Sequence, residues 1–148
     1  MCWPGKITEG SRHRELVSLM DFGPTILEIA GAEIPHWMEA QSLGDLLFQT
    51  TETDRSRVFS EHADDRVVTQ TDFMTMIRTG PWKLVHFVDS QEGQLFNLEA
   101  DPGERVNLWD RPDHADRKRD LIDQILTWRI QSARKTQGFV QMLADRGR

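Results

Sequence analysis

The adjacent residues Glu61 and His62 are the side chains with the clearest potential for chemistry. They close a run of strand-forming residues that begins at Val58, so we expect both at the end of a strand, where they would face a neighbouring cleft. A carboxylate and an imidazole at such a position can hydrogen-bond a polar substrate. The alternative is that His62 is a loop histidine that makes only local hydrogen bonds.

Other polar residues give weaker indications of a site. Asp64 and Asp65 with Asp72 suggest a cation site, but carboxylates in a polar loop are usually solvated. Cys2 is the single cysteine, which excludes an internal disulfide and a paired-cysteine metal site. Three histidines lack the mutual spacing of a metal site: His13, His36 and His114. We therefore predict no catalytic residue and no metal site in this chain.

The composition limits the classes of partner. The chain has 148 residues, 38% of them hydrophobic, and a formal net charge of −6. This balance gives no general attraction to nucleic acid or to an anionic membrane surface, so we expect neither as a partner. No run of about 18 apolar residues is present, and no secretion signal opens the sequence. We expect a soluble protein, whose compartment the sequence leaves unknown.

Four short segments are rich in strand-forming residues and must position Glu61 and His62. They cover residues 58–61, 73–78, 82–88 and 94–98. Short connections around Gly80 and Gly93 favour antiparallel hairpins, which predicts a four-stranded meander. After the fourth strand, Asp101 and Pro102 indicate a turn in which the carboxylate accepts backbone N–H groups.

Helices are expected before and after this sheet. Asp21 is a candidate N-cap, Pro24 fits the first turn, and Gly31 is a C-terminal stop. Ser42 can cap a second short helix. A final helix over residues 113–135 carries an apolar stripe that should pack on the sheet, and residues 131–148 are polar enough to fray. The stripe consists of Leu121, Ile122, Ile125, Leu126 and Trp128.

Four segments, in order, resemble one enzyme family. They are residues 3–6 (WPGK), 17–31 (VSLMDFGPTILEIAG), 41–47 (QSLGDLL), and 76–84 (MIRTGPWKL) followed by 95–108 (LFNLEADPGERVNL). This series is similar to the sulfatases of the alkaline phosphatase superfamily. The second segment is the most specific, because it matches the family pattern D-x-x-P-T-hydrophobic-L-x-hydrophobic-A-G.

The resemblance implies an α+β fold in which a small four-stranded antiparallel sheet is packed by a C-terminal helix. Short helices from the end of an α/β catalytic domain precede that sheet. Residues 1–56 would be the remnant of the catalytic domain, and residues 57–148 the C-terminal subdomain of a sulfatase.

The same resemblance implies that the catalytic chemistry lies elsewhere. Family sulfatases use formylglycine, made from a Cys or Ser in the pattern C/S-x-P-x-R, beside a metal that is usually calcium. The sequence from Cys2 to Lys6 imitates that pattern, but Lys6 stands where Arg is required and cannot replace its bidentate geometry. The family nucleophile also precedes most of the catalytic domain, so Cys2 is expected to be an ordinary residue before a turn. We expect neither calcium nor formylglycine in this chain.

Three functions follow as hypotheses. The first is the C-terminal part of a sulfuric ester hydrolase, inactive alone, with Glu61 and His62 as substrate-cleft candidates. The second is the same part of a phosphonate or phosphodiester hydrolase. The third is a free-standing interaction module. The expected partner is a second copy, bound through residues between Leu16 and Leu47, or the missing catalytic domain.

Overall fold

The computed structural model describes residues 3–48, 55–63, 72–88 and 90–146, with side chains described as far as Phe139. The chain forms two compact units, and each is considered by itself. One comprises residues 1–55 with 131–148, and the other residues 56–130. The predicted division into domains at residues 56 and 57 stays a prediction.

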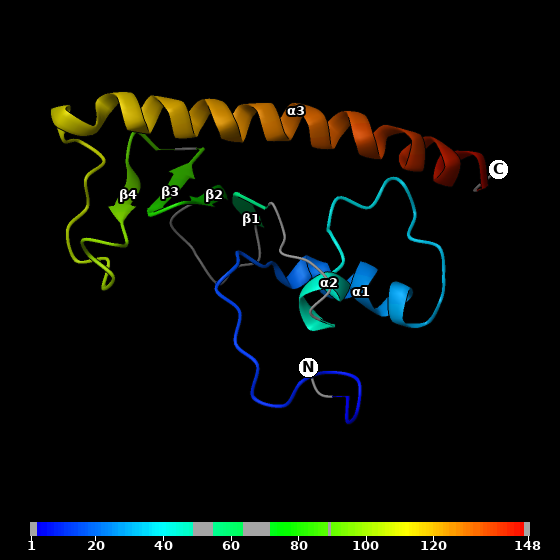
Figure 1. The fold of residues 1–148 in the computed structure, drawn as a ribbon. Helices are drawn as coiled ribbons and strands as arrows, with labels where there is room; N and C mark the ends of the chain where they lie inside the picture. The colour runs from blue at the N-terminus through cyan, green and yellow to red at the C-terminus, as the bar shows by residue number, and fades with distance from the viewer. Residues whose placement is uncertain (1–2, 49–54, 64–71, 89, 147–148) are drawn as a thin grey trace. The chain divides into compact units, whose positions relative to one another are not determined.

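The second unit is built on four antiparallel strands in the order β1-β2-β3-β4 (Figure 1). These are β1 (Arg57–Ala63), β2 (Phe73–Thr79), β3 (Trp82–Phe87) and β4 (Gly93–Asn97). Strand-forming residues separated by short turns predicted this arrangement, and the fold class is confirmed.

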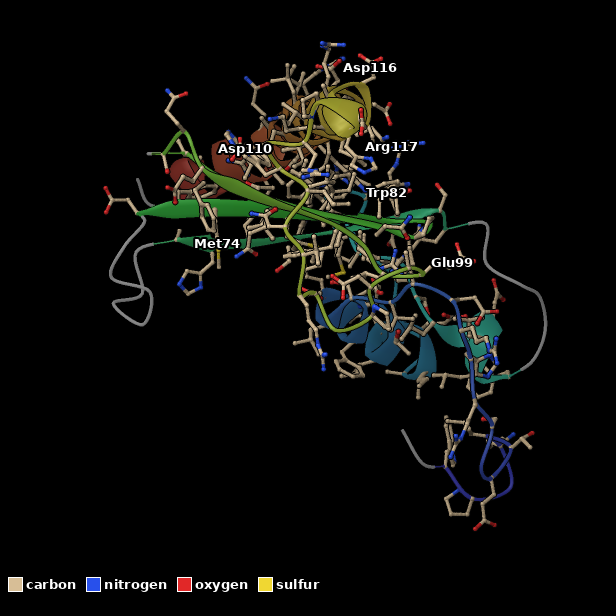
Figure 2. All side chains as sticks on the ribbon, turned by 90° about the vertical axis from the view of Figure 1, so that its left-hand side faces the viewer. Met74, Trp82, Glu99, Asp110, Asp116 and Arg117 are labelled. Atoms are coloured by element: carbon tan, nitrogen blue, oxygen red, sulfur yellow. The ribbon has the colours of Figure 1, made fainter. Side chains whose placement is uncertain are left out.

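A single row of apolar side chains crosses the sheet and forms its core. The register places Phe59 opposite Ile77, Ile77 opposite Leu84, and Leu84 opposite Leu95. Directly opposed residues on neighbouring strands share a face, so all four side chains point the same way. Helix α3 (Ala115–Arg146) covers this face with the predicted apolar stripe, of which Leu121 is fully buried. Leu126 was predicted to belong to this stripe, but it is 57% exposed and lies outside the core. In Figure 2 the helix lies on one side of the sheet, with Trp82 beneath Arg117.

The outer edge of β4 is closed by the segment that follows it. The amide of Leu95 donates to Asn107 Oδ1 at 2.9 Å, and Asn107 Nδ2 donates to the carbonyl of Gly93 at 2.8 Å. The amide of Leu108 then donates to the carbonyl of Leu95 at 2.8 Å. Asn107 thus imitates a neighbouring strand, which satisfies backbone groups that an edge strand leaves open.

The turn after β4 behaves as the sequence predicted. Asp101 Oδ2 accepts the backbone N–H groups of Arg105 and Val106, at 2.7 and 2.9 Å. This carboxylate therefore holds the chain on its way to Asn107.

The first unit contains the short helices η1 (Leu19–Asp21), α1 (Phe22–Ile29) and α2 (Gly44–Leu47). Gly31 has φ of 69°, as expected for a C-terminal stop. The amide of Gly44 donates to Ser42 Oγ at 3.0 Å, so this hydroxyl assists the start of α2, although the residue in the cap position is Leu43.

Asp21 occupies the N-cap position of α1, as predicted, but its side chain does not cap that helix. Its carboxylate makes no cap hydrogen bond to that helix. Instead, Ser18 opens η1, and its amide donates to Asp21 in a capping box. The reason is geometric, because η1 begins three residues before α1 and makes Asp21 the third residue of the first helical turn. In that position a carboxylate bonds back to the amide of the preceding cap residue.

The end of α3 also differs from expectation. The helix does not fray after residue 131 but continues to Arg146. Within the first unit, the rings of Trp37 and Phe139 stack at 4.3 Å, and Lys135 Nζ donates to the carbonyl of Met38 at 2.7 Å. These contacts stabilise turns whose own sequence is polar. In the part of the chain that is described, no helix has the length and apolarity needed to span a membrane.

Candidate functional site

Glu61 lies on the face of the sheet that α3 covers. Its Oε2 accepts Arg129 Nη1 at 2.8 Å, and its Oε1 accepts the hydroxyl of Thr75 at 3.2 Å. The guanidinium of Arg129 also lies 5.7 Å from the ring centroid of Phe73 and 5.8 Å from that of Trp128. Oε2 therefore joins the sheet to the helix, whereas Oε1 joins β1 to β2 within the sheet.

His62 points to the opposite face of the sheet, because successive side chains of a strand alternate. Its cross-strand neighbour is Met74, which in turn lies opposite Phe87. Figure 2 shows Met74 on the side of the sheet away from α3. The structure thus separates Glu61 from His62, so the two cannot act on one group in one cleft. A cleft role for either residue stays a prediction.

The predicted cation cluster is only partly visible. Asp72 is described and exposed, whereas Asp64 and Asp65 lie outside the described residues, as does Cys2. Among the residues with described side chains, no three His, Cys, Asp or Glu lie close enough to hold a metal ion. No cluster in this set therefore fits a calcium ion.

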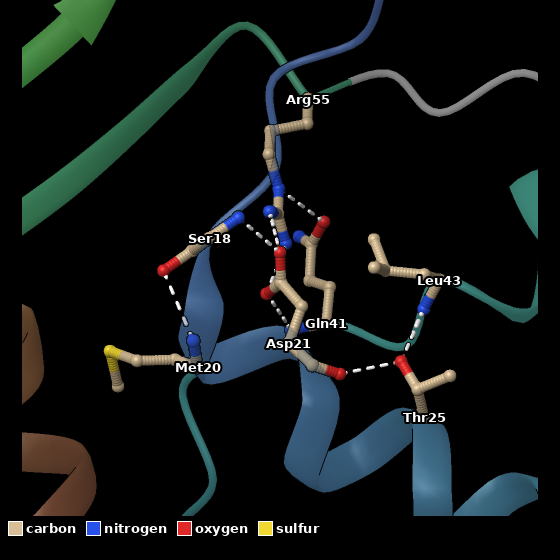
Figure 3. Close-up of polar contacts among 7 residues, drawn as sticks. All are labelled: Ser18, Met20, Asp21, Thr25, Gln41, Leu43 and Arg55. Carbon is tan, nitrogen blue, oxygen red and sulfur yellow. Dashed lines mark hydrogen bonds and ion pairs between the residues drawn. The ribbon is translucent and has the colours of Figure 1, made fainter. Parts of the chain in front are cut away.

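Among the described side chains, the most buried charged group is Asp21, which is 1% exposed and connects three segments (Figure 3). Its Oδ2 accepts the amide of Ser18 at 2.7 Å, and its Oδ1 accepts the amide of Gln41 at 3.2 Å. Arg55 donates from both terminal nitrogens, with Nη2 2.9 Å from Oδ1, and its Nε donates to Gln41 Oε1 at 3.2 Å. This is the bidentate geometry in which an arginine fits a carboxylate best.

Thr25 continues the same junction one helical turn further on. Its hydroxyl donates to the carbonyl of Asp21 and accepts the amide of Leu43 at 2.9 Å. The Asp and the Thr of the D-x-x-P-T pattern therefore fasten residues 41–43 along the start of α1. This explains physically why the pattern needs these two residue types four positions apart.

The electrostatics of Asp21 follow from these contacts. Burial raises the pKa of the carboxyl, but the hydrogen bonds from Arg55, Ser18 and Gln41 and the charge of Arg55 outweigh it, so the pKa is lowered. All of its donors come from the protein, and both oxygens are engaged. The arrangement is thus suited to holding chain segments together rather than to proton transfer.

Sequence reasoning missed both arginines that complete these clusters. Arg55 lies 34 positions from Asp21, and Arg129 lies 68 positions from Glu61. Neither occurs in a spacing pattern that would have indicated its partner. The one available indication is that a buried carboxylate requires a cationic partner. This rule does not identify the residue that provides the cation.

Comparison with known proteins identifies the family of this chain. Residues 1–131 match the family model described as N-sulphoglucosamine sulphohydrolase, C-terminal. The chain belongs to this sulfatase C-terminal family. An N-acetylglucosamine-6-O-sulfatase from Bacteroides thetaiotaomicron is 27% identical, over 81% of this chain and 22% of that protein. An arylsulfatase from Clostridium perfringens is 30% identical, over 83% of this chain and 25% of that protein.

Two solved structures are similar to this chain in sequence and fold. BT4656, solved in complex with its substrate D-glucosamine-2-N,6-O-disulfate, is 28% identical with a TM-score of 0.65, over 76% of this chain and 24% of that one. The phosphonate monoester hydrolase from Silicibacter pomeroyi is 26% identical with a TM-score of 0.64, with the same coverage of both chains. The present chain thus spans about a quarter of the length of the proteins it matches.

Proposed function

We propose that this chain serves as the C-terminal part of a sulfuric ester hydrolase, where it supports the catalytic domain and closes one side of the substrate cleft. The observation that carries the proposal is the family match over residues 1–131, which covers the sheet, the first half of α3 and the Asp21 junction. The sulfatases among its relatives support the choice of ester.

The chain alone is proposed to be inactive. The pattern C-x-P-x-K at Cys2 to Lys6 lacks the arginine of the family nucleophile, and the described side chains include no cluster of three His, Cys, Asp or Glu that could hold a metal ion. The test is to incubate the purified chain with an aryl sulfate and calcium beside a Cys2→Ala control. We expect no turnover by either protein. Turnover that Cys2→Ala abolishes would refute this part of the proposal.

The supporting role is tested in a chimera. The C-terminal quarter of the Clostridium perfringens arylsulfatase would be replaced by this chain, and its activity compared with that of the truncated enzyme. We expect the truncated enzyme to be inactive and the chimera to hydrolyse an aryl sulfate.

His62→Ala in the active chimera tests the cleft role, with Ser60→Ala as the control, because Ser60 lies on the same face of β1 two residues away. We expect a raised KM for His62→Ala alone. Equal kinetics for both variants would exclude His62 from the cleft.

A phosphonate or phosphodiester hydrolase is the second candidate. It is supported by the phosphonate monoester hydrolase from Silicibacter pomeroyi, whose TM-score is nearly that of BT4656. Parallel assays of a product that carries both this chain and a catalytic domain, with an aryl sulfate and an aryl phosphonate monoester, distinguish the two. Higher kcat/KM for the phosphonate would replace the sulfatase proposal.

A further inference from the structure

Strand β1, which carries His62 near its end, is the last strand on one side of the sheet. The strand order β1-β2-β3-β4 gives it β2 as its one strand neighbour in the described part of the sheet. A strand that is paired along one side alone opens more readily at its end than a central strand does. The direction in which His62 points therefore depends on the other contacts that hold the end of β1.

Two neighbouring residues of α3 contact the face of β1 opposite to His62. The rings of Trp128 and Phe59 stack, with their centroids 4.4 Å apart and 3° between their planes. Two residues further along β1, Glu61 Oε2 accepts Arg129 Nη1 at 2.8 Å. Consecutive residues of the helix thus bind alternate residues of the strand, which share one face because strand side chains alternate.

Arg129 contacts the sheet on both sides of His62. It pairs with Glu61, the residue before His62, and its guanidinium carbon lies 5.7 Å from the ring centroid of Phe73. Phe73 is the cross-strand neighbour of Ala63, the residue after His62. One cation therefore holds the strand before and after the residue that points the other way. The side chains of Arg129 and Glu61 are 48% and 25% exposed, so water weakens this ion pair without removing it.

We propose that Arg129 is a positioning residue, which fixes the end of β1 through Glu61 and so directs His62 toward the substrate. This inference rests on the proposed function, in which His62 lies in the cleft. Glu61 also accepts the hydroxyl of Thr75 at 3.2 Å, so its carboxylate connects the helix to both β1 and β2. Arg129 and Glu61 then serve substrate binding from the face of the sheet that is remote from the substrate. The family match over residues 1–131 includes both of them.

The first test is amide hydrogen exchange of the purified chain, which requires no activity. The reporters are the amides of His62 and Met74, which lie opposite each other on β1 and β2. Arg129→Met keeps a long apolar side chain but removes the charge, and it should accelerate their exchange about two- to fivefold, as expected for a partly exposed ion pair. Arg129→Lys retains the charge and should have a smaller effect.

Arg117→Met is the matched control on the same helix. The side chain of Arg117 is 45% exposed, pairs with Asp120 and lies over the ring of Trp82 at 5.5 Å. We expect this variant to leave the exchange of both reporters unchanged. Wild-type exchange in Arg129→Met, or equal acceleration by Arg129→Met and Arg117→Met, would overturn the proposal.

The second test uses the active chimera. Arg129→Met should raise KM about two- to fivefold with little change in kcat, and Arg117→Met should change neither. Arg129→Met added to His62→Ala should raise KM no further, because its effect passes through His62. A KM that rises in His62→Ala but not in Arg129→Met, or additive effects of the two, would overturn the positioning role and leave the cleft role of His62 intact. Unchanged kinetics in His62→Ala would instead reject the cleft role, and this inference with it.

Discussion

Replacement of Asp21 by Asn tests how the first unit is held together. The two side chains have nearly the same shape, but the amide carries no charge and offers one acceptor oxygen in place of two. The guanidinium of Arg55, which is 10% exposed, would then lose its carboxylate partner. Either the amide of Ser18 or that of Gln41 would also meet an NH₂ group instead of an oxygen.

The expected cost of Asp21→Asn is about 3–5 kcal/mol in the free energy of unfolding of the first unit, the range for removal of one partner from a buried ion pair. The matched control is Asp116→Asn, because Asp116 pairs with Arg119 on the surface, where the two side chains are 94% and 69% exposed. That change should cost less than about 0.5 kcal/mol.

The pH dependence gives an independent measure of the same contact. Burial raises the pKa of Asp21, but the bonds from Arg55, Ser18 and Gln41 outweigh it, and the folded-state pKa lies below the ordinary value of 3.8. A depressed folded pKa contributes stability that is present above pH 3.8 and is lost as the pH falls through the folded value. Wild-type stability should therefore fall in that acidic range more steeply than that of Asp21→Asn.

The assay is urea unfolding combined with amide hydrogen exchange at Ser18 and Gln41, whose N–H groups report directly on the contact. Arg55→Met added to Asp21→Asn should recover part of the loss, because the guanidinium that has lost its carboxylate is then absent. A loss below about 1 kcal/mol, or one equal to that of Asp116→Asn, would refute the reasoning.

Three further changes test the second unit. Gly93→Ala would place a Cβ 2.5 Å from Trp109 Cζ3 and should cost about 1–3 kcal/mol, with partial recovery on adding Trp109→Leu; additive losses in urea unfolding would contradict this. Asn107→Ala leaves the Leu95 amide unpaired and should accelerate its hydrogen exchange, at a cost of about 1–3 kcal/mol; unchanged exchange would show that water replaces the side chain. Trp128→Ala removes a ring stacked on Phe59 at 4.4 Å, and because Trp128 is only partly buried the loss should be about 2–3 kcal/mol; a loss below about 1 kcal/mol would show that this stacking contributes little.

Local patterns were sufficient to predict the elements of the fold. The alternation of strand-forming residues around Gly80 and Gly93 predicted the four strands and their antiparallel order, which the structure confirms. The stripe through Leu121 and Ile125 predicted the side of the last helix that packs on the sheet. These features depend on backbone geometry and side-chain period, which are properties of neighbouring residues.

The polar contacts depended on tertiary structure. Asp is a residue type that commonly caps helices, yet the carboxylate of Asp21 points toward Arg55. Only the folded chain brings Arg55 within reach. Glu61 and His62 are adjacent in sequence, but the pleat of β1 sends them to opposite faces, and Arg129 binds only one of them. A hydrogen bond or ion pair requires particular distances and directions, and these exist only after distant segments have packed.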